Sequence, residues 1–296
     1  MNRLTVLLVS GALWALMTFR LVEREIVPYL EYMEQPTYGT LLRGKLEPEV
    51  KIYDIYHMIS NRIGTSEVMV RPGEKAGWVI ESRMKMYTEL MLKDWKIPVN
   101  HQAVSETVID EAYKVSRMSM DGSTMGMKFS MNGIRRGTAL DLAYDMGLLG
   151  KGSMMVDMDD ESMIGDSFSP FLGGGRLWKG KHWKLQVLDT FSLVGMGGSK
   201  GGVNKKVVYA EVEGRAILRW QGQDVYCWVV HVRETPHSEL PMYTLHVTDD
   251  GTVLSTRYYM GKGGDMSFEI RLRDKRRLSP EEARDWNWSV PSGKGR

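Results

Sequence analysis

YKVSRMSMDGSTMGMKFSM, residues 113 to 131, places an oily side chain at every second position in each of its halves. A period of two is typical of a β-strand with one buried face. Asp121-Gly122 between the halves suits the positive φ angles of a tight turn, so the stretch predicts a β-hairpin that turns there. The residues that share the buried face of this hairpin are Met118, Met120, Met125, Met127, Phe129 and Met131.

The neighbouring segments extend the same pattern. Upstream, GWVIESRMKMYTELMLKDW (77–95) predicts one long strand or a hairpin, with Met84 and Met86 two positions apart. Downstream, the apolar residues of TALDLAYDMGLLG (138–150) have mixed spacing, so a short helix is possible there and the type of element stays undecided.

The second half of the chain reads as a meander of strands. Its strand-like runs are KKVVYAEVEG, RAILRWQ, DVYCWVVHVRE, MYTLHVTDD, TVLSTRYYMG and MSFEIRLRD. Turns are predicted at 221–223 and 249–251, where Gly follows polar residues. A short helix should end the series, because Ser279, Pro280 and Glu282 form the pattern of a capping box with proline at the first helical position.

These patterns predict a mainly β (α+β) fold: an N-terminal membrane helix, then a curved antiparallel sheet or half-barrel with a few helices, including a C-terminal one. The expected organisation is a transmembrane anchor and juxtamembrane helix (1–33), a linker (34–49), a β domain with its C-terminal helix (50–288) and a tail (289–296).

The N-terminus carries the membrane prediction. Between Arg3 and Arg20 the chain has no charge, and Leu4 to Phe19 alone would give roughly 24 Å of helix. We favour an uncleaved single-pass anchor over a cleaved signal peptide, because Leu13 stands where a cleavage site needs a small residue. The expected location is the inner membrane with the main domain exported, in the periplasm, although the positive charges on the two sides nearly cancel.

Composition excludes several classes of protein. The 296 residues carry a net charge of +2 and are 43% hydrophobic, which argues against disorder and against nucleic-acid binding. The single cysteine, Cys227, cannot form an internal disulfide. The 22 methionines are unusual, and they concentrate in the middle of the chain. Methionine fills irregular apolar space and adapts to varied partners.

Two stretches resemble nucleotide or esterase motifs. Gly175 and Gly180-Lys181 nearly match a phosphate-binding loop, but a strand pattern follows where a helix is required, so we interpret the stretch as a turn. The Gly-Asp-Ser at 165–167 resembles the nucleophile block of GDS-type esterases. Ser167 would then be the nucleophile, yet the Asp-x-x-His of that family is missing. The chain is therefore expected not to be an enzyme.

Metal and cofactor sites are not predicted. The acidic stretch 157–166 lacks the glycine that an EF-hand requires, and the six histidines show no ligand spacing. The Met-x-Met pairs could bind Cu(I), but their alternation with Phe129 favours a core or a cavity lining.

A basic cluster lies near the C-terminus, at Arg271, Arg273, Lys275, Arg276 and Arg277. It is either a solvated strand end or a surface that lies on anionic headgroups.

The order of features over about residues 75 to 273 resembles the LolA/LolB-like bacterial envelope domains. The resemblance lies in GKHWKLQVLD (180–189), in the paired strands at 207–232 and in YTLHVTDDGTVLSTRYYMG (243–261). It implies a curved antiparallel sheet with helices on its concave side and an apolar cavity between them. Domains of this kind bind acyl chains or serve as envelope scaffolds.

The resulting expectation is a membrane-anchored, non-catalytic domain that binds a lipid or a lipidated protein in a β cavity lined by the six side chains of the 113–131 hairpin. Expected partners are membrane lipid and lipoproteins or other envelope proteins, and no cofactor. Two alternatives stay open: a structural subunit of an envelope assembly with a fully packed methionine core, and an esterase that uses Ser167.

Overall fold

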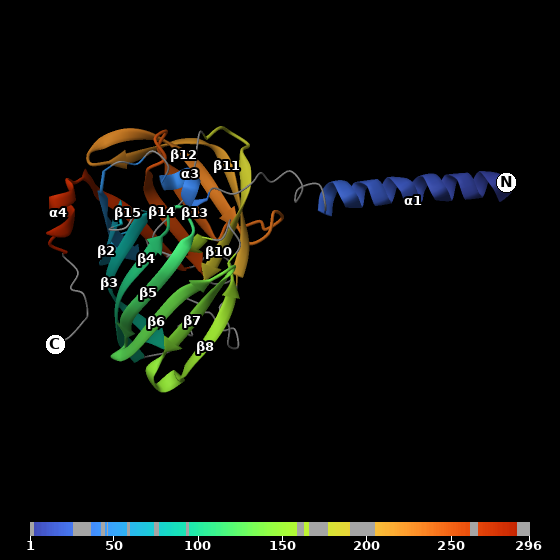
Figure 1. The fold of residues 1–296 in the computed structure, drawn as a ribbon. Coiled ribbons are helices and arrows are strands. Elements are labelled where there is room, and N and C mark those ends of the chain that lie inside the picture. Colours follow the sequence, from blue (N-terminus) through green and yellow to red (C-terminus); the bar gives the residue numbers. More distant parts are fainter. Residues whose placement is uncertain are drawn as a thin grey trace.

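The structure, a computed structural model, describes residues 3–25, 37–42, 45, 47–57, 60–73, 77–92, 95–158, 163–165, 177–189, 205–260 and 266–288. Its centre is one 15-stranded sheet (Figure 1). Neighbouring strands run antiparallel except for β9 and β10, which are parallel. The prediction of a mainly β, antiparallel fold is confirmed.

Two meanders make up the sheet. The first consists of β1 (Glu49–His57), β2 (Asn61–Pro72), β3 (Trp78–Leu92), β4 (Trp95–Ile109), β5 (Val115–Thr124), β6 (Met127–Arg136), β7 (Ala139–Asp145) and β8 (Lys151–Asp157). The second consists of β9 (Met163–Gly165), β10 (His182–Asp189), β11 (Lys205–Trp220), β12 (Gln223–Arg233), β13 (Tyr243–Val247), β14 (Val253–Met260) and β15 (Met266–Arg277). The first strand pairs with the last, from Glu49 opposite Arg277 to His57 opposite Phe268.

This strand order forces the sheet to curl. Its two edges are β8 and β9, which follow one another in the chain. A flat sheet of this size would be roughly 67 Å wide, at about 4.8 Å for each step between strands. The chain from Asp157 to Met163 reaches at most roughly 21 Å when fully extended. The sheet therefore bends round until its edges approach, although no ladder joins β8 to β9 among the described residues.

The hairpin at 113–131 forms, but its turn is not at Asp121-Gly122. Strand β5 continues through both residues, and the chain turns at Met125 (φ 52°) and Gly126 (φ 80°) instead. Gly122 serves a different purpose, because a Cβ at this position would collide with the ring of Phe129 on β6. A glycine in mid-strand here permits close packing of an aromatic neighbour.

Other predicted elements need smaller corrections. Residues 139–145 form strand β7, followed by the short 3₁₀ helix η1 (Gly147–Leu149), so no α-helix forms there. The two runs before Gln221 are one continuous strand, β11, whose register with β12 shifts between Val212 and Gly214. The turn predicted at 221–223 forms at 221–222, and the turn predicted at 249–251 is confirmed.

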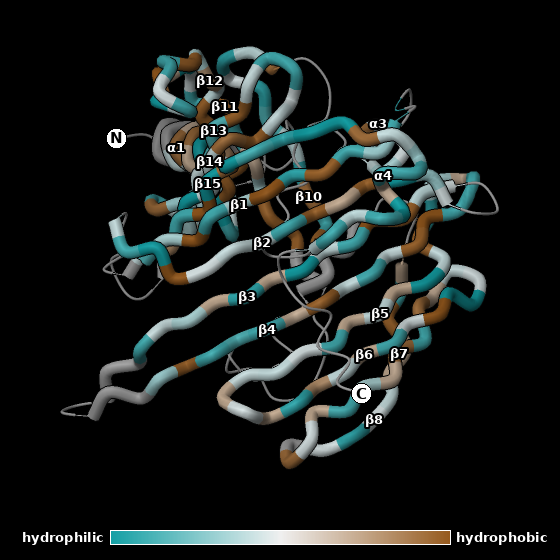
Figure 2. The backbone as a smooth tube through the Cα atoms, turned by 90° about the vertical axis from the view of Figure 1, so that its left-hand side faces the viewer, coloured by the Kyte–Doolittle hydropathy of each residue, from teal (hydrophilic) through white to brown (hydrophobic). Residues whose placement is uncertain are grey.

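The buried apolar residues form two large clusters. The first core cluster joins residues of β1 to β8 with residues of β12, β14 and β15. The second core cluster occupies β10 to β14 and includes Trp183, Leu185 and Val230. Figure 2 shows hydrophobic and hydrophilic residues alternating along many of the strands.

Among the described residues, three α-helices accompany the sheet. Helix α1 (Arg3–Glu25) extends away from it in Figure 1 and exposes Trp14, Met17 and Phe19. Of the helices that the described residues form, none combines the length and the apolar character needed to cross a membrane.

Helix α3 (Tyr38–Leu42) lies in the segment that was expected to be a linker, 34–49. Its Tyr38 and Leu42 are buried in the first core cluster, so this part of the segment belongs to the core of the domain.

Helix α4 (Pro280–Arg284) has the predicted capping box between Ser279 and Glu282. Together with Leu278, it covers Val50 and Met69, and Trp286 and Trp288 pack beside them. Val50 and Met69 face away from the first core cluster, and α4 lies outside the sheet in Figure 1. We therefore call this side the outer face, and the side that carries Tyr53, Ile55 and Met84 the inner face.

Candidate functional site

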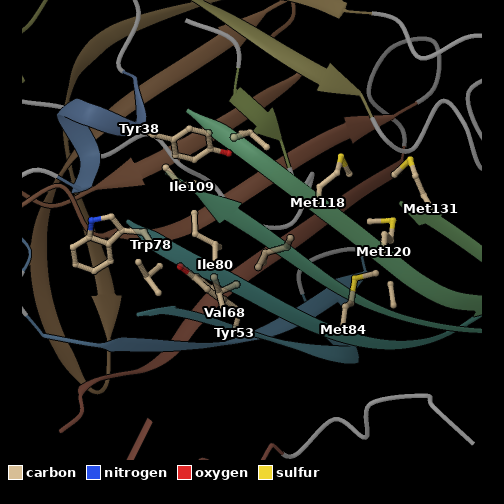
Figure 3. Close-up of a cluster of buried hydrophobic side chains, with 14 of the residues drawn as sticks. Tyr38, Tyr53, Val68, Trp78, Ile80, Met84, Ile109, Met118, Met120 and Met131 are labelled. Atoms are coloured by element: carbon tan, nitrogen blue, oxygen red, sulfur yellow. The ribbon is translucent and has the colours of Figure 1, made fainter. Parts of the chain in front are cut away.

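Methionines cover a large part of the inner face of the first meander. They belong to the first core cluster, in which six are buried and two are partly buried. We call this set the methionine wall: Met84, Met86, Met118, Met120, Met131, Met146, Met154 and Met158. Figure 3 shows four of them, which lie on β3, β5 and β6: Met84, Met118, Met120 and Met131. Alternation along the strands explains the set, because residues two apart share a face.

The second core cluster has a different composition. Its buried members are valine, leucine, alanine and tryptophan, without methionine among the described residues. β-branched and aromatic side chains have few rotamers, whereas methionine has three flexible bonds and a polarisable sulfur. The two halves of the interior therefore differ in how readily their side chains can rearrange.

The six predicted lining residues separate into two groups. Met118, Met120, Phe129 and Met131 are 2–7% exposed and lie in the first core cluster. Met125 and Met127 are 46% and 39% exposed, because the turn falls at 125–126 instead of 121–122. Whether the six contact a ligand stays a prediction.

Exposed apolar residues gather at the end of the sheet where β5 turns into β6. Met125 and Met127 belong to this turn. Tyr87 lies on β3, two strands away from β5, and Leu148 lies in η1, which contacts β6. We call these four residues the apolar rim. Single exposed apolar residues are ordinary, whereas a group of them often marks an interaction site.

A histidine that the sequence pattern did not single out lies just inside the apolar rim. The His101 ring is buried, lies 2.5 Å from the Thr124 hydroxyl through Nδ1, and stacks on Phe129 at 6.0 Å between centroids. Burial lowers the pKa of His101, which favours the neutral ring. Its position on the inner face follows from the register of β4 with β5, which no local motif reveals.

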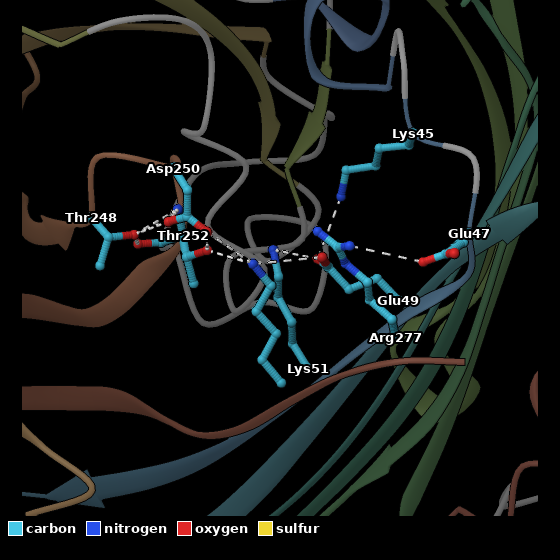
Figure 4. A network of polar contacts seen from close by, with 9 residues as sticks. Lys45, Glu47, Glu49, Lys51, Thr248, Asp250, Thr252 and Arg277 are labelled. Atoms are coloured by element: carbon cyan, nitrogen blue, oxygen red, sulfur yellow. Dashed lines mark hydrogen bonds and ion pairs between the residues drawn. The ribbon is translucent and has the colours of Figure 1, made fainter. Parts of the chain in front are cut away.

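Charged side chains occupy the inner face near the opposite end. Glu49 on β1 is 12% exposed and lies 3.4 Å from Lys45, 3.1 Å from Lys51 and 3.6 Å from Lys275. We call the three lysines around this carboxylate the lysine cluster (Figure 4). Burial alone would raise the pKa of Glu49, but the three ammonium groups outweigh burial, and the pKa lies below 4.5.

The predicted basic surface at 271–277 is divided by the alternation of β15. Lys275 and Arg277 pair with the inward positions Lys51 and Glu49, whereas Arg276 pairs with the outward position Val50. Each of the five cations lies within 4.0 Å of a carboxylate: Arg271 of Glu269, Arg273 of Asp54, Lys275 of Glu49 and Asp250, Arg276 of Asp274, and Arg277 of Glu47. The structure thus brings together only part of this set on any one face, and membrane contact by it stays a prediction.

The remaining sequence motifs contribute little to the site. Ser167 and four of the five acidic residues in the stretch 157–166 lie outside the described residues. Lys179-Gly180 forms a turn and β10 follows it, so the predicted turn and strand are confirmed, while Gly175 lies outside the described residues. Within the part of the chain that the structure describes, no three His, Cys, Asp or Glu residues are grouped as metal ligands.

Comparison with known proteins identifies no family. No protein-family model and no curated protein sequence matches the chain. Among solved structures, the chain is similar to a beta-barrel-like protein of the domain of unknown function DUF1849 from Brucella abortus, at 10% identity and a TM-score of 0.48, over 79% of this chain and 99% of that one.

It is also similar to a protein with a YmcC-like fold from Bacteroides fragilis, at 10% identity and a TM-score of 0.25, over 78% of this chain and 97% of that one. The resemblance to LolA/LolB-like domains stays a prediction.

Proposed function

We propose that this protein is a non-catalytic binding domain that holds a hydrophobic ligand, such as a lipid or the acyl chain of a lipidated protein, against the methionine wall. The observation that carries the proposal is the uneven distribution of methionine between the two core clusters. A core needs only shape and volume, and the second core cluster meets that need without a buried methionine. Flexible thioethers on one wall suit an occupant of variable shape.

The apolar rim supports the same proposal, because it offers an approach to the wall. Met127 is exposed, and Phe129 and Met131, on the same face of β6, are buried. An apolar ligand that moved along this strand would exchange contacts with water for contacts with side chains. Each methylene that it buried would contribute about 0.8 kcal/mol.

The test uses the full chain and a neutral apolar dye, N-phenyl-1-naphthylamine. We expect saturable binding that is displaced by added fatty acid or phospholipid, and lipid in an organic extract of the purified protein. A double variant, Met118→Leu with Met131→Leu, keeps core volume at a cost below about 1.5 kcal/mol for each substitution but makes these side chains less flexible. It should bind a narrower range of acyl-chain lengths than the wild type.

Met69→Leu is the matched control, since Met69 is equally buried but lies on the outer face under α4. A clean extract together with no saturable dye binding would contradict the proposal and favour the packed structural subunit.

Membrane attachment is the second part of the proposal. Helix α1 exposes Trp14, Met17 and Phe19 to water, which is unfavourable for large apolar side chains. Transfer of these side chains into an apolar phase would remove that contact with water. We expect the full chain to sediment with membranes, and a chain lacking residues 1–33 to remain in the supernatant. Equal partition of the two forms would rule out attachment through α1.

A further inference from the structure

The lysine cluster lies on the same inner face of the sheet as the methionine wall. Across the inner face, Lys51 is in register with Val68, Ser82 and Ser105 and then with Met120 and Met131. Four strand steps separate Lys51 from Met120, which is roughly 19 Å around the curve. The inner face of the sheet therefore carries ammonium groups at one place and thioethers at another.

The three lysines converge from separate parts of the chain. Lys51 comes from β1, Lys275 from β15, and Lys45 from the segment that follows α3. Lys51 and Lys275 stand directly opposite one another in the register of β1 with β15. Like charges opposed in this way destabilise a strand pair. One lysine would be enough to form a salt bridge with Glu49. The stability of the sheet therefore does not explain why three lysines are present.

Among the residues that the structure describes, the carboxylates do not balance this charge. Lys45 and Lys51 both pair with Glu49, and Lys275 shares it. Asp250, the other acid at Lys275, also accepts hydrogen bonds from the backbone N–H and the hydroxyl of Thr252 and from the hydroxyl of Thr248, within the β13–β14 turn. Three ammonium groups thus face two carboxylates, one of which holds a turn together. One further negative charge would neutralise the group.

The lysines are also partly desolvated but still reachable. Their side chains are 24–32% exposed, so the ammonium groups are neither free in water nor sealed in the core. An anion that joined them would replace water at a site where charges interact more strongly than at an open surface. Lysine acts as a point charge toward phosphate, so three converging ammonium groups suit its tetrahedral oxygens.

We propose that Lys45, Lys51 and Lys275 bind the phosphate of an anionic amphiphile whose apolar part lies along the methionine wall. This inference rests on the proposed function and names the chemical class of its ligand. The phosphate takes the place of the missing negative charge beside Glu49, and the register of the inner face directs the attached chain from the lysines toward Met120.

Calorimetric titration of the full chain with three soluble probes tests this assignment: dihexanoyl phosphatidate, dihexanoylglycerol and inorganic phosphate. We expect the phosphatidate to bind at least tenfold more tightly than either of the other two. Lys51→Gln and Lys45→Gln should each weaken phosphatidate binding roughly tenfold, as expected for loss of a charge-assisted contact. Both should leave dihexanoylglycerol binding unchanged. Lys85→Gln, at an exposed position on β3, is the matched control and should change neither.

The outcomes separate the two proposals. Equal binding of phosphatidate and dihexanoylglycerol, unaffected by the lysine variants, would overturn the headgroup site and leave the hydrophobic-ligand function standing. Inorganic phosphate binding as tightly as phosphatidate would show a site for the free anion and overturn the amphiphile. Binding of none of the three would contradict both proposals. Thermal unfolding of each variant shows that it is folded, and since Lys45 lies outside the sheet, its replacement tests the site without changing a strand.

Discussion

Glu49 shows how much one side chain can determine at the end of a sheet. It stands on the inner face of β1, opposite Arg277 of β15, and its carboxylate is shared by the lysine cluster. Without it, Lys51 and Lys275 would face each other across the strand pair, and Asp250 would be the one other described carboxylate paired with Lys275. A carboxylate in this position both joins the two strands and keeps the cations in place.

The ionisation of Glu49 leads to a prediction about pH. Since its pKa in the folded protein is lower than in the unfolded chain, its contribution to stability is full above about pH 4.5 and disappears as the pH falls through the folded value. We expect Glu49→Gln to lower the free energy of unfolding at pH 7 by about 1–3 kcal/mol, the range for breaking a buried charged contact.

The measurement is urea unfolding of both proteins between pH 7 and pH 3. The difference between them should shrink as the pH falls below 4.5. A constant difference over this range would mean that the glutamate acts through its shape and not through its charge.

Among the elements, the β5–β6 hairpin is the most informative. Its two turn residues, Met125 and Gly126, both have positive φ, as a type I′ turn requires. Glycine adopts this conformation freely, but for methionine it costs roughly 1–2 kcal/mol. Met125 is also part of the apolar rim. The backbone strain at this residue therefore lies where the ligand is proposed to approach.

Replacing this methionine should therefore stabilise the protein. Asparagine tolerates positive φ, and we expect Met125→Asn to raise the free energy of unfolding by about 1 kcal/mol. Met127→Asn is the comparison, because Met127 is similarly exposed but begins a strand, where asparagine is disfavoured. Thermal and urea unfolding of the two variants should shift in opposite directions. A loss of stability in both would mean that Met125 makes contacts that outweigh its backbone strain.

The same hairpin shows what local patterns can and cannot predict. Alternation correctly predicts both strands, and the glycine turn at 221–222 and the cap at Ser279 follow from local chemistry. The turn position was wrong because Asp121-Gly122 is equally compatible with a turn and with a strand that needs room for Phe129. Choosing between them requires knowledge of the partner strand. The lysine cluster was missed for a related reason: it exists only once β1 pairs with β15, and no spacing within either segment indicates that register.

At the scale of the whole molecule, the two meanders of the curled sheet are joined on one side and, among the described residues, not on the other. The two meanders are held together by β1 and β15, whereas β8 and β9 share no ladder among the described residues. The connection between β8 and β9 should thus be dispensable for holding the meanders together, and the β1–β15 pairing should be essential.

Cleavage between the meanders tests this arrangement. A protease site inserted between Met158 and Met163 would divide the chain into two pieces, each with one complete meander. We expect the pieces to elute together in size-exclusion chromatography and to separate only in denaturant. With Ile55→Lys and Ile270→Lys, which place two buried cations opposite each other at the joint, they should come apart after cleavage. Separation of the unmodified pieces would show that the β1–β15 pairing is too weak to hold the meanders.

The pairing of the first strand with the last has a consequence for synthesis. As the nascent chain leaves the ribosome, β1 emerges early with one edge unsatisfied, and its partner is among the final segments to be translated. During that interval an exposed strand edge can bind other chains, which is the usual start of aggregation. A stop codon shortly before Met266 would make this interval permanent, so a chain shortened by so little should accumulate as insoluble material while loss of the tail beyond Trp288 should be harmless.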